Sequence, residues 1–223
     1  MRWLVVTADD FGMSPGINRG IVQAHRGGIL TSASLLVNRP ASDEAAALGR
    51  DCPALSIGLH LELDKGDPER AGAELDGQLA RFLDLVGAPP THVDSHHDVH
   101  QDRRVLPHVL EWAGRAGVPV RGHSPARHVG QFYGQWGGDR HLEQISFEGL
   151  LRLVDVEVCD GITELTCHPG YVEPRFRSSY TVEREVELRT LCDPRVPREI
   201  EARQIRLVGF RDLAARATRA LIR

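Results

Sequence analysis

Short apolar runs rich in β-branched residues alternate with longer segments of helical periodicity along most of this chain. The first run, WLVVTA at residues 3–8, is followed by Ser14-Pro15, which is typical of a helix N-cap with proline at the first helical position. An apolar stripe at helical spacing then continues to Gly27-Gly28, which ends the predicted helix. The same pattern predicts further strands at 29–37, 55–63, 91–96, 118–122, 162–168 and 204–210. It predicts further helices at 42–50, 74–87, 103–116, 181–192 and after residue 210. Residues 123–145 are predicted to form a long loop.

Repeated β–α units of this length predict parallel strands, arranged either as a (β/α) barrel or as a doubly wound sheet. Polar residues stand at the C-terminal ends of several different predicted strands, namely Asp9-Asp10, His60, the segment 94–100, Arg121 and His168. In a barrel these ends meet at one mouth, whereas a doubly wound sheet gathers only those near its switch point. We therefore expect an α/β protein with a distorted barrel and an active site at the C-terminal ends of its strands.

Composition excludes several classes of protein. The 223 residues suffice for one domain with a substantial core, and the formal charge of −4 argues against a nucleic-acid binder that relies on a basic surface. The four cysteines are scattered without a CxxC pair, which excludes a thiolate zinc knuckle and gives no sign of a disulfide scaffold. The first apolar run is too short for a signal peptide, and no apolar stretch reaches membrane-spanning length. We expect one domain over residues 1–223 in the cytoplasm, without a nucleic-acid or membrane partner.

The adjacent acids of TADDFG, Asp9 and Asp10, directly follow a predicted buried strand. Successive strand residues point to opposite faces, but the turn at a strand end can bring both carboxylates to the mouth. One acid could then bind a cation while the other acts as a base. Alternatively, one of them merely caps the next helix.

The decapeptide THVDSHHDVH, residues 91–100, contains four histidines and two aspartates. Its predicted strand face carries His92, Asp94 and His96, and the following loop carries His97, Asp98 and His100. Three or four protein ligands suffice for a catalytic zinc-type site, so the other side chains are expected to orient the ligands or contact a substrate. The alternative is a hydrogen-bond network without a cation.

Two further histidines stand at strand ends. His60 lies in the apolar run LSIGLHLEL, where a lone histidine is more often a core residue, but its place at a C-terminal strand end favours a ligand. His168 precedes Pro169-Gly170 and is a candidate general acid, because imidazole titrates near neutrality; the alternative is a structural histidine. No role is predicted for His25, His108, His123, His128 or His141.

An ordered set of motifs covers most of the chain: TADDFG, NRGIVQAHRGGILTSASLLVN at 18–38, LSIGLHLEL, THVDSHHDVH, FYG at 132–134 and TCHPGY. Each motif alone is modest, but the ordered set resembles the YdjC-like carbohydrate deacetylase family. The members of this family include a diacetylchitobiose deacetylase and a branch associated with hopanoid biosynthesis. The resemblance implies a distorted (β/α) barrel and a divalent metal held by one aspartate and two histidines.

Carried onto this sequence, the resemblance implies Asp10, His60 and His96 as metal ligands, Asp9 as catalytic base and His168 as general acid. Arg121 would keep the Asp9 carboxylate ionised. Substrate or outer-shell contacts are expected from His92, Asp94, His97, Asp98, His100 and Tyr133. Two imidazoles and one carboxylate suit zinc, while Mg²⁺, Mn²⁺ and Co²⁺ remain open.

The sequence departs from the family pattern in two places. Asp98 stands where the family usually has a histidine, and the connection between His60 and Thr91 is short, so the loop that overhangs the pocket is trimmed. We therefore expect an open cleft, walled on one side by Phe132, Tyr133 and Trp136. Such a cleft suits a sugar that is part of a larger molecule.

The expected activity is metal-dependent removal of an N-acetyl group from an amino sugar in an oligosaccharide or glycosylated compound, with release of acetate. A homodimer is expected from the resemblance. The alternatives are a metal-dependent phosphoesterase or another barrel hydrolase, and a metal- or sugar-binding module without turnover.

Overall fold

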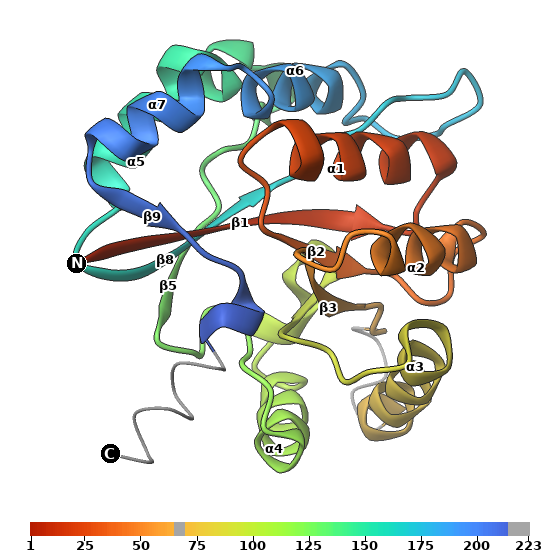
Figure 1. The fold of residues 1–223 in the computed structure, drawn as a ribbon. Coiled ribbons are helices and arrows are strands. Elements are labelled where there is room, and N and C mark those ends of the chain that lie inside the picture. The colour runs from red at the N-terminus through yellow and green to blue at the C-terminus, as the bar shows by residue number, and fades with distance from the viewer. Residues whose placement is uncertain (65–69, 214–223) are drawn as a thin grey trace.

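A curled sheet of parallel strands forms the centre of the computed structural model, which describes residues 1–64 and 70–213 (Figure 1). The strand order is β4-β3-β2-β1-β8-β5, and β9 also pairs with β1. The strands of this sheet are β1 (Arg2–Phe11), β2 (Ser32–Leu35), β3 (Ser56–Leu61), β4 (Val93–Ser95), β5 (Ala126–Val129), β8 (Gly161–Cys167) and β9 (Ile205–Leu207). All of its pairings are parallel, so the predicted α/β architecture is confirmed as a half-barrel with helices around it.

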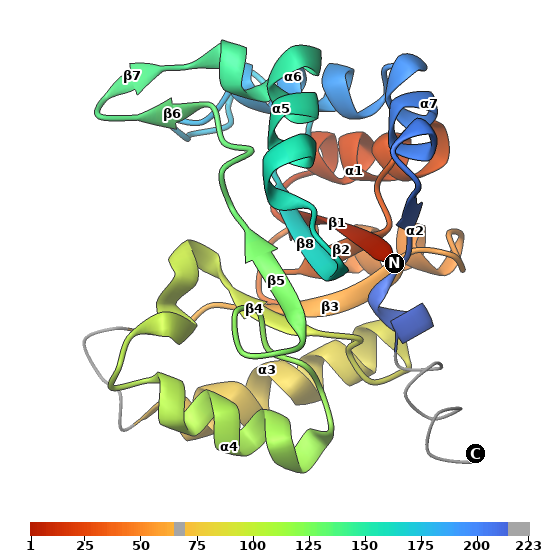
Figure 2. The same cartoon turned by 90° about the vertical axis from the view of Figure 1, so that its left-hand side faces the viewer.

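Helices surround the curled sheet in two groups. Figures 1 and 2 show α1, α5, α6 and α7 together on one side, and α3 and α4 on the opposite side. The α-helices are α1 (Pro15–Gly27), α2 (Ser42–Arg50), α3 (Ala71–Val86), α4 (Leu106–Ala116), α5 (Phe147–Glu157), α6 (Val182–Leu191) and α7 (Arg195–Ala202). Two short 3-10 helices, η2 (His96–Gln101) and η3 (Leu142–Ile145), and a hairpin of β6 (Gln135–Trp136) and β7 (Asp139–Arg140) complete the described elements. Among the described residues, no helix combines the length and apolar character that crossing a membrane requires.

Local sequence signals explain where the first helix begins and ends. The Ser14 side chain accepts a hydrogen bond from the Ile17 amide at 3.3 Å, and Pro15 occupies the first helical turn. Gly28 is the C-cap, as predicted, and the apolar stripe of α1 is buried. Because Ser14 supplies the cap, the alternative in which Asp9 or Asp10 caps this helix is wrong.

Several segments differ from the sequence prediction. The strand predicted at 118–122 is reduced to a single bridge between Val93 and Val120, because Pro119 has no amide proton to donate and the chain turns at Gly122, whose φ is +74°. The loop predicted at 123–145 contains β5, which pairs with β8 inside the main sheet. The helices α5 and α7 were not predicted. The C-terminal helix predicted after residue 210 and the short connection between His60 and Thr91 lie in part outside the described residues.

The interior face of β1 changes character along its length. Val5, Thr7 and Asp9 share this face by strand alternation. At the N-terminal end Val5 packs with Val208 and Phe210 in a small apolar cluster. At the C-terminal end the same face presents Asp9. The interior of the curled sheet is therefore apolar at the N-terminal end of β1 and polar at its C-terminal end, where the mouth lies.

Candidate metal and acid–base site

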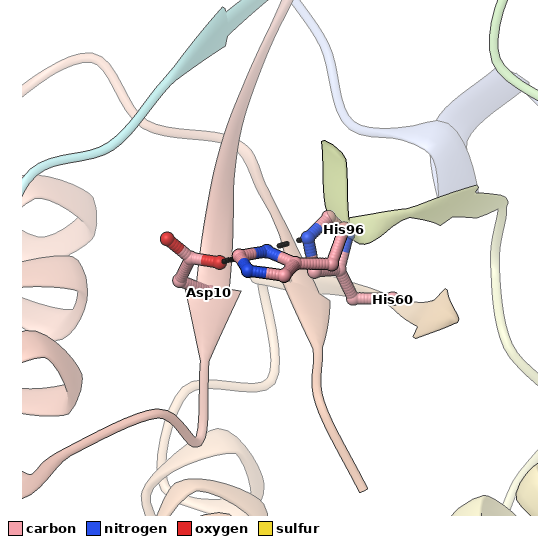
Figure 3. Close-up of side chains that lie close together, drawn as sticks. All are labelled: Asp10, His60 and His96. Atoms are coloured by element: carbon pink, nitrogen blue, oxygen red, sulfur yellow. Dashed lines mark ion pairs between the residues drawn. The ribbon is translucent and has the colours of Figure 1, made fainter. Parts of the chain in front are cut away.

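Three side chains from different strand ends converge at the mouth of the sheet. Figure 3 shows Asp10 at the end of β1, with His60 of β3 and His96 of η2 facing it. Asp10 Oδ1 lies 3.6 Å from His60 Nε2 and 3.1 Å from His96 Nδ1. One ligand atom of each residue lies within 4.8 Å of the other two, which is a spacing that could hold one metal ion.

A tight turn brings both adjacent acids to this mouth. Asp10 has a φ of +68°, in the left-handed region that non-glycine residues seldom occupy, and such a conformation costs about 1–3 kcal/mol. Gly12 follows with a φ of +98°, and a Cβ atom there would lie 2.6 Å from the Leu36 carbonyl oxygen. The backbone is therefore held in a conformation that presents Asp9 and Asp10 at the same mouth.

The carboxylate of Asp94 orients His60. Its Oδ1 lies 2.7 Å from His60 Nδ1, and its Oδ2 accepts a hydrogen bond from the Ser34 hydroxyl at 2.6 Å. This contact leaves His60 Nε2 facing Asp10, the arrangement in which carboxylates support metal-binding histidines. Burial lowers the pKa of His60, but the carboxylates of Asp94, Asp9 and Asp10 outweigh it and raise the pKa to about 9. The surroundings of this imidazole therefore favour a positive charge.

The donor set fits a divalent cation. Asp10 Oδ1 is buried and has no hydrogen-bond partner among the described residues, although it faces two imidazole nitrogens. A cation between these atoms would satisfy that oxygen and replace the proton on His60. A second group, Asp9, His60 and Asp94, has similar spacing, but Arg121 already occupies oxygens of both acids.

Arg121 binds Asp9 through a two-pronged ion pair. Its Nη1 and Nη2 donate to the two carboxylate oxygens of Asp9, each at 2.8 Å. It also pairs with Asp94, and its Nε donates to Glu164 at 3.2 Å. Burial lowers the pKa of Arg121, but these three carboxylates raise it well above its ordinary value. Arg121 thus lies where the sequence prediction requires it, beside Asp9.

His168 stands at the end of β8, near Asp9. Its Nε2 lies 3.9 Å from Asp9 Oδ2, and its backbone amide donates to the carboxylate of Glu187. Burial lowers the pKa of His168, although the charges of Asp9 and Asp10 oppose this effect. The imidazole is therefore biased toward its neutral form.

The six charged or imidazole side chains of THVDSHHDVH do not share one role. His96, His97 and Asp98 line the cleft, and the last two adopt left-handed backbone conformations with φ of 55° and 52°. His92 is buried away from it, hydrogen-bonded to Ser34 and stacked on Phe210. His100 is buried against Ser95 and the Arg121 carbonyl. The strand β4 ends at Ser95 and His96 begins η2, so His96 does not lie on a strand face shared with His92 and Asp94, as the sequence predicted.

The cleft above these residues has a volume of about 660 Å³. Tyr133 lines it, stacks on Tyr180 with ring centroids 4.4 Å apart, and meets His168 edge-on at 5.6 Å. The other two aromatic residues expected in this wall are elsewhere: Phe132 is fully buried, and Trp136 is 49% exposed and stacks on His141. Residues 176–180 also line the cleft.

Sequence reasoning missed several residues that hold the site together. Arg184 of α6 donates to Asp10 Oδ2 at 2.5 Å, and Glu187 of the same helix binds the backbone of His168. His128, which had no predicted role, lines the cleft and contacts the Thr166 hydroxyl at 2.7 Å. In the sequence, VEREVELRTL is indistinguishable from an ordinary charged helix, so no signal in it pointed to the site.

Comparison with known proteins gives consistent matches over nearly the whole chain. The family described as YdjC-like protein matches residues 3–74 and 65–202. A carbohydrate deacetylase of Geobacillus stearothermophilus is 35% identical, with 95% of this chain and 98% of that protein covered. A chitooligosaccharide deacetylase of Enterobacter sp. (strain 638) is 34% identical, with coverages of 95% and 99%.

Solved structures agree with these matches. A putative cellobiose-phosphate cleavage protein of Enterococcus faecalis superposes with a TM-score of 0.84 at 28% identity, with 95% of this chain and 98% of that chain covered. A family 4 acetyl xylan esterase of Clostridium thermocellum, in complex with a cobalt ion, gives a TM-score of 0.59 at 15% identity, with coverages of 95% and 90%. The second likeness concerns the fold alone.

Proposed function

The chain belongs to the YdjC-like protein family, and from that premise we propose that it is a metal-dependent carbohydrate deacetylase. It removes an N-acetyl group from an amino sugar and releases acetate. Relatives at 34–35% identity, which bear the names carbohydrate deacetylase and chitooligosaccharide deacetylase, support this proposal. The structural observation that supports it most is that the two adjacent acids have different partners. Asp9 pairs with Arg121, whereas Asp10 faces two histidines.

Asp10, His60 and His96 would hold the cation. When bound, a divalent metal polarises the acetyl carbonyl and lowers the pKa of an attacking water. Two imidazoles and one carboxylate suit zinc, with Mg²⁺, Mn²⁺ and Co²⁺ as the alternatives that metal analysis decides. Arg121 pairs with the carboxylates of Asp9 and Asp94, and its positive charge opposes the binding of a second metal there. This argues against a two-metal phosphoesterase mechanism.

We assign the proton transfers to Asp9 and His168. The Asp9 carboxylate is the base that takes a proton from the attacking water. Its Oδ2 lies 3.9 Å from His168 Nε2, so the proton has a short path to an imidazole whose pKa burial lowers. His168 Nε2 then gives the proton to the leaving amine. Arg121 stays charged throughout and holds the orientation of Asp9 by two hydrogen bonds.

The shape of the cleft supports a sugar substrate larger than one ring. Tyr133 offers an aromatic edge or face beside His168, and aromatic rings bury the C–H surface of sugars while the hydroxyls stay hydrated. Asp98, His128 and Ser178 supply polar groups to the same cleft. A volume of about 660 Å³ accommodates more than the acetylated ring, which favours an oligosaccharide or a glycosylated compound.

Metal analysis combined with an acetate-release assay tests the proposal. The purified protein is expected to bind one divalent cation per chain and to release acetate and a free amine in equal amounts from N-acetylated sugars. A chelator should abolish release, and added metal should restore it. Absence of metal-dependent acetate release from all N-acetylated mono- and oligosaccharides would overturn the proposal.

A further inference from the structure

Each of the adjacent acids has its own buried arginine. Arg121 takes both oxygens of Asp9, whereas Arg184 takes only one oxygen of Asp10. The Arg184 Nη2 donates to Asp10 Oδ2 at 2.5 Å, and Arg184 is 4% exposed. Nothing in the proposed chemistry requires this second arginine to touch the substrate, so its contact with Asp10 needs a separate explanation.

The guanidinium of Arg184 is fixed in place from several sides. Its Nε donates to the Tyr180 carbonyl at 3.2 Å, and its Nη1 donates to the His168 carbonyl at 3.4 Å. The rings of Phe176 and Tyr180 have centroids 5.7 and 5.8 Å from its Cζ atom, within the range of cation–π attraction. Arg184 therefore cannot move away from Asp10 without breaking its hydrogen bonds to the carbonyl groups of His168 and Tyr180.

The two oxygens of Asp10 therefore have different surroundings. Oδ2 is occupied by Arg184, while Oδ1 faces His60 and His96 and has no hydrogen-bond partner among the described residues. A carboxylate that is free on both sides can rotate and bind a cation with two oxygens, but Asp10 can offer only one.

We propose that Arg184 is a positioning residue that sets the metal preference of the site by limiting Asp10 to a single oxygen. Two nitrogens and one oxygen suit zinc, whereas manganese and magnesium favour sites with more oxygen ligands. The inference rests on the proposed cation site of Asp10, His60 and His96. It concerns which cation binds there, and not whether one binds.

Removing Arg184 has two effects that a ratio of affinities separates. The lost positive charge strengthens the binding of every divalent cation to a similar extent. The freed Oδ2 adds an oxygen ligand, which benefits manganese more than zinc. The ratio of the manganese Kd to the zinc Kd therefore isolates the effect of the second oxygen.

The test measures both dissociation constants on metal-free protein, with zinc by chelator competition and manganese by electron paramagnetic resonance. In Arg184→Met the manganese-to-zinc Kd ratio is expected to fall about tenfold, in the lower part of the range that outer-shell substitutions produce. Arg184→Gln, which keeps a donor for the Tyr180 carbonyl but is too short to reach Asp10, should give the same change. Arg184→Lys retains a cation beside Oδ2 and should keep the wild-type ratio. Arg189→Met, on the exposed side of the same helix, is the matched control and should also keep it.

The outcomes separate this inference from the proposed function. An unchanged ratio in Arg184→Met and Arg184→Gln would overturn the inference alone, as would equal loss of both cations, which would indicate a role in folding only. A wild-type protein whose metal binding is unaffected by Asp10→Ala would overturn the proposed cation site, and this inference with it.

Discussion

The Nδ1 of His60 lies 2.7 Å from Oδ1 of Asp94, so the orientation of one strand's histidine is set by the acid of the neighbouring strand. The strands β3 and β4 pair directly, with His60 opposite Asp94 in the register. Because the carboxylate accepts the Nδ1 proton, Nε2 remains free to face Asp10. The register of two short strands thus decides which nitrogen of His60 is available to a cation.

Asp94→Asn should weaken metal binding by about 10- to 100-fold, because an amide accepts the Nδ1 proton less well and no longer fixes the ring. Isothermal titration of metal-free protein measures the change. Asp84→Asn removes an exposed acid from α3 and serves as the control for the lost charge. Equal affinities in the Asp94 variant and the wild type would show that this carboxylate does not support the metal site.

Alanine substitution of Asp10, His60 or His96 should remove the metal and the activity together, since each residue would supply one of only three protein ligands. Metal content after gel filtration and acetate release measure the two effects. Full metal occupancy with full turnover in any one variant would show that its ligand assignment is wrong.

Asp9→Asn should retain the metal while turnover falls by about 100-fold or more, because an amide cannot take a proton from water. Asp9 is bound by Arg121 rather than directed at His96, so the cation should not depend on it. Metal content and kcat are measured on the same preparation. Loss of the metal would indicate that the roles of Asp9 and Asp10 are exchanged.

Glu187 should make the folded protein less stable as the pH rises through the neutral range. Burial raises its pKa from an ordinary value of 4.5 to about 8, although its bonds with Tyr180 and His168 oppose this effect. Because the pKa of Glu187 is higher in the folded state than in the unfolded state, the stabilisation from this group is complete below pH 4.5. It is lost as the pH rises toward 8. The free energy of unfolding should therefore decline by at most about 1.4 kcal/mol per pH unit from this group.

Urea denaturation of Glu187→Gln between pH 5 and pH 8, with a chelator present, measures this contribution against the pKa of about 8. The variant should show a flatter dependence on pH than the wild type. Glu185→Gln, on the same helix but partly exposed, should keep the wild-type slope. If the free energy of unfolding depended on pH in the same way in all three proteins, a group other than Glu187 would be responsible for that dependence.

Substrate length should affect turnover, since the cleft of about 660 Å³ extends beyond the acetylated ring. N-acetylated oligosaccharides or aglycone-bearing analogues are expected to show a higher kcat/KM than free N-acetylglucosamine. Acetate release across a length series makes the comparison. If the monosaccharide has the highest kcat/KM, the extended-cleft interpretation is wrong.

The sequence predicted the parts of the fold that follow from local rules. The cap at Ser14, the end of α1 at Gly28 and the bounds of α2 are set by residues adjacent in the chain. The strand ends that carry Asp10, His60 and His168 could also be predicted, because buried strands end where apolar residues give way to polar ones. These positions were sufficient to indicate the candidate site.

What the sequence could not predict depends on pairing across long distances. The ARHV segment of β5 lies at the edge of the sheet, where only its two end residues are buried, and it shows no apolar run. Arg184 and Glu187 resemble solvent-exposed helix residues until the helix is packed against the mouth. The burial of His92 on Phe210 depends equally on a contact with the far end of the described chain.

The ion pair between Asp10 and Arg184 joins residues that are 174 positions apart, and the pair between Asp9 and Arg121 spans 112 positions. A ribosome adding about 5–20 residues per second makes the Asp10 end of this pair roughly 10–35 s before the Arg184 end. Throughout that interval the Asp10 carboxylate lacks the arginine that pairs with it in the folded protein, and for the earlier part of it Asp9 lacks Arg121 as well. The strands β1 to β4 can pair early, but the mouth of the sheet should reach its native structure last. Pauses in translation before α6 are therefore expected to prolong a state in which only that end of the molecule is sensitive to proteases.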